Sequence, residues 1–298
     1  MRAWPSILLA AALLAGGAGA QARLAEEQID VPVQVRDAQG SPVSHTVRVT
    51  VFSDDANPRP APLAIINHGR SGSAEGRAAL GRARYGEAAR YLVGQGFVVA
   101  VPTRVGYGVT GGADVEASGA CARRDYPPAY AAAADQTLAV LAALRRRPDV
   151  APERVLVMGQ SFGGLAAVAV AAANPPGVRA AINFAGGGGG SPSSHPGQPC
   201  SPTALEALFQ GYGRTARVPM LWVYAENDRY FGPHLPRQWH AAFTQAGGQA
   251  QFVQFPPHGQ DGHALFTRFP AVWQPVVSAF LDTHGFTAPH LKQEETQP

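Results

Sequence analysis

The fold is decided by the stretch VLVMGQSFGGLAAVAVAAA at residues 155–173. Its first residues are apolar and typical of a buried strand, and its alanine-rich second half predicts a helix. Between the two stands the sequence G-Q-S-F-G. A serine on so tight a strand-to-helix turn needs glycine two positions before and after it, because side chains there would collide. Ser161 is therefore a candidate nucleophile, placed at a helix N-terminus where negative charge is stabilised.

Short apolar runs alternate with helical segments along most of the chain. The runs are nearly continuous, as parallel strands buried on both faces require. The apolar runs are 63–67, 97–102, 155–159, 178–184, 219–224 and 251–255, and the predicted helices lie near 76–94, 129–147, 163–173, 234–246 and 264–283. This order predicts an α/β fold with a doubly wound, mainly parallel sheet and helices on both faces. Ahead of it, 29–36 and 46–52 flank a Gly-Ser-Pro turn and predict an antiparallel hairpin.

The composition is that of a globular protein. The 298 residues carry 24 basic and 21 acidic groups, for a formal net charge of +3, and 46% of them are hydrophobic. This balance excludes a disordered chain, and a chain of this length buries enough surface to fold without a disulfide framework. The basic residues are scattered rather than gathered on one face or in a known motif, which argues against nucleic-acid binding.

Residues 1–22 have the pattern of a signal peptide. One positive charge at Arg2 precedes an apolar stretch over 7–15, and small residues follow. Cleavage is expected after Ala20 or Ala22, since each completes an A-x-A pattern. A retained membrane anchor is the alternative, but the apolar stretch is too short to span about 30 Å of hydrocarbon. We expect an exported protein, periplasmic or extracellular, without stable membrane insertion after cleavage.

Export gives the two cysteines, Cys121 and Cys200, a specific meaning. In an oxidising compartment an even number of cysteines indicates a disulfide, and two cysteines without paired histidines nearby do not make a zinc site. A bridge between them would stabilise the fold by about 4–5 kcal/mol in the chain-entropy model. Two unpaired buried thiols are the alternative. We expect the disulfide, and neither a metal nor a cofactor.

The chain is expected to form one domain over residues 23–288. Within it, 188–217 follow a glycine run at 186–190 and have the length of a lid-like excursion over the sheet edge. The polar residues 289–298 are expected to form a flexible tail. Nothing in the sequence specifies an oligomeric state.

A serine becomes a strong nucleophile only when a base removes its proton, so a histidine and an orienting acid are required. On sheets with this turn, the acid and then the histidine follow the serine in the chain. Asp228 is the preferred acid, because it lies in the loop after the run 219–224, and Glu226 and Asp261 are alternatives.

The base is expected in the loop after the run 251–255. Both His258 and His263 lie there, and we favour His263, which follows the flexible Gly262 and precedes a helix. A lone histidine is usually structural. Three complementary residues in the expected order, each after a strand, are much harder to explain as structural residues alone.

An acyl-transfer site also needs two backbone N–H donors for the oxyanion. The residue after the nucleophile, Phe162, is one, and Arg70, in the loop after the run 63–67, is the other. His68 in that loop is interpreted as a residue that braces it. Tyr107, Tyr230 and Phe231 lie beside these loops and are candidate pocket walls, although they could equally be ordinary rim aromatics.

These residues resemble the α/β-hydrolase superfamily and, within it, the dienelactone-hydrolase-like branch. The matching pieces are His68-Gly69, the loop 104–108, the turn 159–164, Glu226-Asn227-Asp228 and Asp261-Gly262-His263. The resemblance implies an eight-stranded, mainly parallel sheet with an antiparallel second strand. It also implies a Ser-His-Asp mechanism without metal. In that topology two strands separate the loops of Cys121 and Cys200, a gap of about 15 Å at the sheet that loops of this length can close.

The resemblance implies hydrolysis of a small-molecule substrate. Dienelactone hydrolases proper are intracellular and use a cysteine nucleophile, whereas this chain has Ser161 and a predicted signal peptide, which favours ordinary carboxylic esters. A serine exopeptidase of the same fold is the alternative enzyme. A catalytically silent binding protein is the alternative from another class.

Overall fold

A computed structural model describes residues 24–286, so the predicted signal peptide and the predicted flexible tail lie outside the described residues. The centre is an eight-stranded sheet with the order β1-β2-β4-β3-β5-β6-β7-β8. Its strands are β1 (Ala25–Arg36), β2 (Pro42–Ser53), β3 (Ala61–Asn67), β4 (Val98–Thr103), β5 (Val150–Gln160), β6 (Val178–Phe184), β7 (Met220–Ala225) and β8 (Ala250–Phe255). Strands β3 to β8 run parallel, whereas β2 is antiparallel to β1 and β4. The predicted α/β-hydrolase fold is confirmed.

The N-terminal hairpin is longer than predicted, and its pairing follows from its alternation. Val31 and Val33 on β1 are buried, whereas Pro32 and Gln34 between and after them are exposed. Val31 pairs with Val47 on β2, so apolar residues of both strands share the inner face. That face packs against helix α3.

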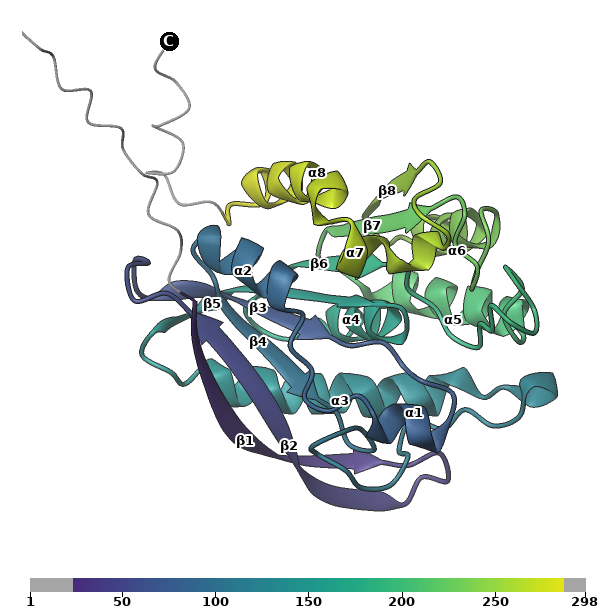
Figure 1. Cartoon of the computed structure of the whole chain (residues 1–298), viewed down its shortest axis with the longest axis horizontal. Coiled ribbons are helices and arrows are strands. Elements are labelled where there is room, and N and C mark those ends of the chain that lie inside the picture. Colours follow the sequence, from purple (N-terminus) through teal and green to yellow (C-terminus); the bar gives the residue numbers. More distant parts are fainter. Residues whose placement is uncertain (1–23, 287–298) are drawn as a thin grey trace, which may run out of the picture.

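Helices cover both faces of the sheet (Figure 1). They are α1 (Ala74–Ala78), α2 (Gly86–Gly94), α3 (Tyr126–Leu144), α4 (Phe162–Ala172), α5 (Pro202–Thr215), α6 (Leu235–Gln245), α7 (Leu265–Arg268) and α8 (Pro270–Thr283). Buried residues of α3, α4, α5 and α6 form one apolar cluster, and those of α2, α7 and α8 form the other. Each face of the sheet therefore has its own core.

Two predicted helices are each divided in the structure. The segment 76–94 becomes α1 and α2, because Gly81 and Tyr85 between them adopt left-handed backbone conformations at φ +63° and +46°. The segment 264–283 becomes α7 and α8, because Pro270 disfavours helical geometry at Phe269 before it. Helix α3 begins earlier than predicted, since Pro127 and Pro128 fit its first turn.

Helix α5 was not predicted, and it occupies the second half of the expected excursion 188–217. It packs against α6, and Gly213 is the reason the two can approach closely. A Cβ atom at that position would lie only 2.1 Å from the carbonyl oxygen of Phe243. This part of the excursion is thus a helix that contributes Leu205 and Phe209 to the core.

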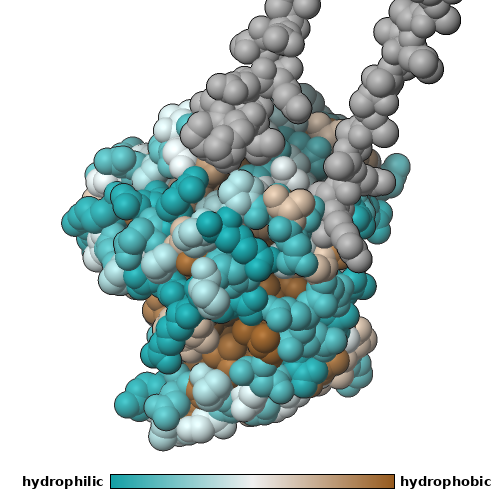
Figure 2. Space-filling model, turned by 90° about the vertical axis from the view of Figure 1, so that its left-hand side faces the viewer, coloured by the Kyte–Doolittle hydropathy of each residue, from teal (hydrophilic) through white to brown (hydrophobic). Residues whose placement is uncertain are grey.

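The carboxyl ends of the parallel strands share one edge of the sheet, where ligands bind in open α/β folds. Over residues 24–286 no helix combines the length and apolarity needed to cross a membrane. Figure 2 shows a face of the molecule that is largely polar. Its apolar patch lies at the same height as α3 and the N-terminal hairpin in Figure 1, because the two views differ only by a turn about the vertical axis.

Candidate active site

Ser161 sits on a strained turn between β5 and α4. Its backbone angles are φ +59° and ψ −125°, a conformation that non-glycine residues adopt only when their surroundings impose it. The flanking glycines are required by contact: a Cβ at Gly159 would lie 2.2 Å from the carbonyl oxygen of Gly163. A Cβ at Gly163 would lie 2.2 Å from the carbonyl oxygen of Asn67. The elbow is therefore packed against the end of β3.

Asp228 and His263 are brought together from two loops, after β7 and after β8. The Nδ1 atom of His263 lies 2.9 Å from Oδ2 of Asp228. The other carboxylate oxygen of Asp228 accepts the N–H groups of Tyr230 at 2.7 Å and Phe231 at 3.1 Å. The Asp228 side chain is fully buried, so both of its oxygens are held in place.

The alternative acids and the alternative base are used elsewhere. Glu226 is exposed, and Asp261 accepts the backbone N–H groups of Arg229 and His263, each at 3.0 Å. Asp261 therefore shapes the loop that carries His263. The Nδ1 atom of His258 lies 2.7 Å from the carbonyl oxygen of Pro256.

Two aromatic rings fix the plane of the His263 ring. Tyr230 stacks on it with ring centroids 3.9 Å apart and an angle of 23° between the planes. Phe231 meets it at an edge, with centroids 5.3 Å apart. With Nδ1 bound to Asp228, the ring has one orientation and directs Nε2 away from the carboxylate.

A cavity of about 440 Å³ adjoins Ser161. Phe162 and Arg70, the predicted oxyanion donors, and Tyr230 and Phe231, the candidate pocket walls, are among the residues that line it. The other lining residues are Ser71, Gly72, Ser118, Cys121, Arg124, Tyr126, Gly187, Gly188, Gly189, Gly190, Ser191, Pro192, His195 and Cys200. Within residues 24–286, this wall contains two arginines and no acidic residue.

A second cavity of about 360 Å³ is lined by both Ser161 and His263. Tyr107 lines this one rather than the larger pocket, and it is almost fully buried, with its hydroxyl donating to Glu116 at 2.6 Å. No hydrogen bond joins the Ser161 and His263 side chains, both of which the structure describes. Catalytic hydrogen bonds are often longer in unliganded enzymes and tighten with substrate.

The loop after β3 lies directly against the nucleophile. A Cβ at Gly69 would lie 3.4 Å from the Cβ of Ser161, so glycine permits this approach. The Arg70 side chain points away to form a two-pronged ion pair with Asp114, at 2.7 and 2.6 Å. That pair anchors the backbone of the predicted second oxyanion donor.

His68 braces this loop, as the sequence predicted. Its Nδ1 atom lies 2.7 Å from the carbonyl oxygen of Gly69, and its Nε2 accepts the N–H of Arg104 at 3.1 Å. Burial, reinforced by the nearby Arg104 charge, holds the pKa of His68 well below its usual value, so the ring stays neutral. The Arg104 guanidinium is itself buried and paired with Glu116 at 2.5 Å.

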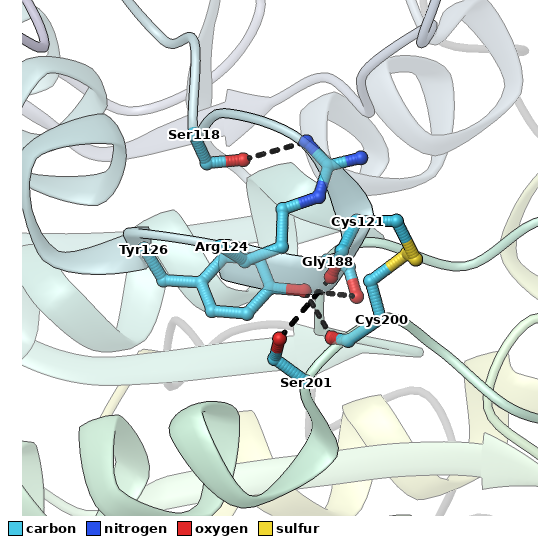
Figure 3. Close-up of a disulfide and its surroundings, with 7 residues drawn as sticks. All are labelled: Ser118, Cys121, Arg124, Tyr126, Gly188, Cys200 and Ser201. Carbon is cyan, nitrogen blue, oxygen red and sulfur yellow. Dashed lines mark hydrogen bonds between the residues drawn. A yellow bond between two sulfur atoms is a disulfide. The ribbon is translucent and has the colours of Figure 1, made fainter.

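The predicted disulfide between Cys121 and Cys200 is present at the rim of the larger cavity (Figure 3), with a Cα–Cα distance of 5.0 Å. The Tyr126 hydroxyl lies beside it and donates to the carbonyl oxygen of Cys200 at 2.5 Å. Burial raises the pKa of Tyr126 to about 12, so this hydroxyl keeps its proton. The bridge ties the segment before α3 to the segment before α5.

Sequence reasoning missed Gln160 and Tyr85. Gln160 donates to the carbonyl oxygen of His263 at 2.9 Å, and Tyr85 accepts the N–H of Gly69 at 3.2 Å. Gln160 occupies the variable position before the nucleophile, so no local pattern marks it. Among residues 24–286, no group of three His, Cys, Asp or Glu side chains could hold a metal.

Comparison with known proteins identifies the family. Among curated protein sequences, none is significantly similar to this chain. A solved structure assigned as a dienelactone hydrolase from Klebsiella pneumoniae shares 15% identity, with a TM-score of 0.56 over 87% of this chain and 98% of that one. An acetyl xylan esterase from Paenibacillus sp. R4 shares 16%, with a TM-score of 0.57 over 89% and 90%.

A puromycin-hydrolysing peptidase from Mycobacterium tuberculosis is also similar in structure. It shares 16% identity and a TM-score of 0.56 over 86% of this chain, but that match covers only 39% of the peptidase. The profile of the dienelactone hydrolase family matches residues 77–274, which include Ser161, Asp228 and His263. The chain belongs to the dienelactone hydrolase family of hydrolases.

Proposed function

We propose that this protein hydrolyses carboxylic esters through Ser161, His263 and Asp228. The observation that carries the proposal is the 2.9 Å contact between His263 Nδ1 and the buried Asp228 carboxylate, beside a cavity that Ser161 also lines. Asp228 selects the tautomer with the proton on Nδ1, which leaves Nε2 unprotonated as the base. Nε2 takes the proton of Ser161 as its hydroxyl attacks the ester carbonyl.

His263 carries a proton in the step that forms the acyl-enzyme and another in the step that breaks it. It gives the Ser161 proton to the departing alcohol, then removes a proton from the water molecule that attacks the acyl carbon and returns that proton to Ser161. The N–H groups of Phe162 and Arg70 hold the oxyanion in both steps, and each such donor lowers the barrier by about 3–4 kcal/mol in measured systems. Phe162 is the first residue of α4, where backbone N–H groups lack partners within the helix.

The charge of the larger cavity argues against an aminopeptidase. An aminopeptidase must bind a free ammonium group, for which buried carboxylates are the usual partners. Among the described residues, the wall of the larger cavity contains Arg124 and the Asp114-paired Arg70, but no acidic side chain. The mycobacterial peptidase is more than twice as long as the region it shares with this chain.

The test uses p-nitrophenyl esters of increasing chain length and the p-nitroanilide with the same acyl group. We expect ester hydrolysis, with the anilide at least 100-fold slower. Ser161→Ala should lower kcat by about 10⁶-fold. A fluorophosphonate probe should label the wild-type protein at Ser161. Absence of labelling would favour a catalytically silent binding protein, and efficient anilide cleavage would favour an exopeptidase.

We further propose that the enzyme is exported. The Cys121–Cys200 disulfide supports this, because such bridges persist mainly in oxidising compartments. N-terminal sequencing of the protein from its native host should find Gln21 or Arg23 as the first residue. An intact Met1 in a cytosolic fraction would contradict the proposal.

A further inference from the structure

The side chain of Gln160 connects the segments that carry the proposed catalytic groups. It lies at the end of β5, immediately before Ser161. Its Nε2 donates to the backbone carbonyl of His263 at 2.9 Å, and its Oε1 accepts from the Tyr85 hydroxyl at 3.3 Å. The same hydroxyl accepts the N–H of Gly69 at 3.2 Å. One relay thus joins the serine turn, the histidine loop and the predicted oxyanion loop.

These hydrogen bonds are compatible with only one orientation of the Gln160 amide group. Rotating the amide by 180° would place its oxygen against the His263 carbonyl and its nitrogen against the Tyr85 hydroxyl. The first of these contacts would join two acceptors. Burial raises the pKa of Tyr85, so its hydroxyl keeps the proton that it donates.

Tyr85 is held in an unfavourable backbone conformation. Its φ of +46° and ψ of +47° are left-handed, which bulky residues rarely adopt without compensation. Its ring packs on Phe266 of α7, the helix that follows His263, with centroids 5.4 Å apart. The strained residue therefore contacts the histidine segment through its ring and the other two loops through its hydroxyl.

Among the described residues, His263 is held from two sides. Asp228 binds Nδ1, Tyr230 and a second aromatic ring pack on the imidazole, and Asp261 accepts the backbone N–H. These contacts lie within the loops after β7 and β8. The bond from Gln160 to the carbonyl oxygen comes instead from the serine turn. This bond ties His263 directly to the residue next to the nucleophile.

We infer that Gln160 is a positioning residue, which sets the reach of His263 Nε2 to the Ser161 hydroxyl. Tyr85 extends this control to the Gly69 backbone beside Arg70. The inference rests on the proposed function. Because misplacement of about 1 Å can cost 100-fold in rate, losing the bond should lower kcat rather than weaken substrate binding.

The test compares Gln160→Met with Gln238→Met, the same change at an exposed position on α6. Active serines are first counted by fluorophosphonate titration, and kcat is expressed per titrated site. Gln160→Met should lower kcat by about 10–100-fold with KM changed less than twofold. Gln160→Glu should lower kcat by a similar factor, because its carboxylate can accept the hydrogen bond of Tyr85 but cannot donate one to the His263 carbonyl. Gln238→Met should match the wild type.

Tyr85→Phe provides an independent check on the relay. It keeps the ring contact with Phe266 but loses the hydroxyl, so we expect a smaller loss of about 3–10-fold. Because both residues act in one chain of hydrogen bonds, adding Tyr85→Phe to Gln160→Met should lower kcat by a smaller factor than Tyr85→Phe does alone. Multiplicative losses in the double variant would contradict the relay.

Several outcomes separate this inference from the proposed function. Unchanged kcat per site in Gln160→Met, or fewer active sites with normal turnover, would overturn the positioning role and leave the ester hydrolase standing. Wild-type protein that is neither labelled nor active would overturn the function. Nitrogen-15 NMR of the His263 ring tests the position without turnover. The chemical shifts of its ring nitrogens should change in Gln160→Met and not in Gln238→Met. Unchanged shifts in Gln160→Met would contradict the inference.

Discussion

The loop after β3 and the loop after β8 each carry a histidine at the carboxyl edge of the sheet, in different surroundings. His68 is 1% exposed, and both of its ring nitrogens have partners, the Gly69 carbonyl and the Arg104 N–H. His263 is 8% exposed, and of its two ring nitrogens only Nδ1 has a hydrogen-bond partner, the Asp228 carboxylate. Across residues 24–286, no hydrogen-bond partner meets its Nε2.

The charges around the two rings are opposite in sign. The Arg104 guanidinium donates to the His68 carbonyl and disfavours a second positive charge on that ring. A carboxylate faces His263 instead, and it would stabilise the cation that the proposed mechanism forms on this ring. Both residues are histidines at the carboxyl edge of the sheet, so the neighbouring charge and the free nitrogen distinguish the proposed base from the brace.

The largest effect should come from removing the proposed base. His263→Ala should lower kcat for p-nitrophenyl butyrate by about 10⁶-fold, because it removes the group proposed to deprotonate Ser161. Circular dichroism should show an unchanged fold. If His263→Ala kept substantial activity while His68→Ala lost it, the assignment of the two histidines would be reversed.

Asp228→Asn tests whether the carboxylate is what makes His263 a base. The amide retains the size of the side chain but favours the wrong tautomer of the ring, so kcat should fall by about 10³–10⁴-fold. The matched control is Asp261→Asn, whose side-chain oxygen can still accept the N–H groups of Arg229 and His263. In this control variant kcat should fall less than tenfold. Equal losses in both variants would contradict the special role of Asp228.

The framework of this comparison could be predicted from sequence because its signals are local. The glycines around Ser161 mark the turn, and the apolar runs mark the strands whose ends carry Asp228 and His263. The flexible Gly262 and the helix that follows were enough to favour His263 over His258. The disulfide followed from two cysteines and a predicted signal peptide.

The positioning contacts could not be predicted, because they join residues far apart in the chain. Gln160 and His263 are separated by 103 positions, and Tyr85 and Gln160 by 75. The buried Arg104–Glu116 pair, which supports His68, has no hydrophobic pattern to mark it. Helix α5 was missed because its glycines lower helix propensity, although Gly213 is what lets it pack on α6.

His68→Gln should affect stability more than turnover. The amide can replace at most part of the two contacts of the ring, and a buried carbonyl or N–H left without a partner costs about 1–3 kcal/mol. We expect the free energy of unfolding in urea to fall by that amount and kcat to fall less than tenfold. A loss of kcat as large as that in His263→Ala, without loss of stability, would give His68 a chemical role.

The pH dependence of stability gives the smallest effect and tests the charge argument directly. The pKa of His68 is lowered on folding, so between the folded value and the unfolded value of about 6.5 the unfolded chain binds more protons. Its contribution to stability is therefore complete above about pH 6.5 and is lost as the pH falls. Between pH 7.5 and 5.5 the free energy of unfolding should fall by an amount on the order of 1 kcal/mol. Other histidines also titrate, so the measured quantity is the difference between wild type and His68→Gln in urea unfolding. An equal change in both proteins would mean that the buried ring accepts a proton beside Arg104 without penalty.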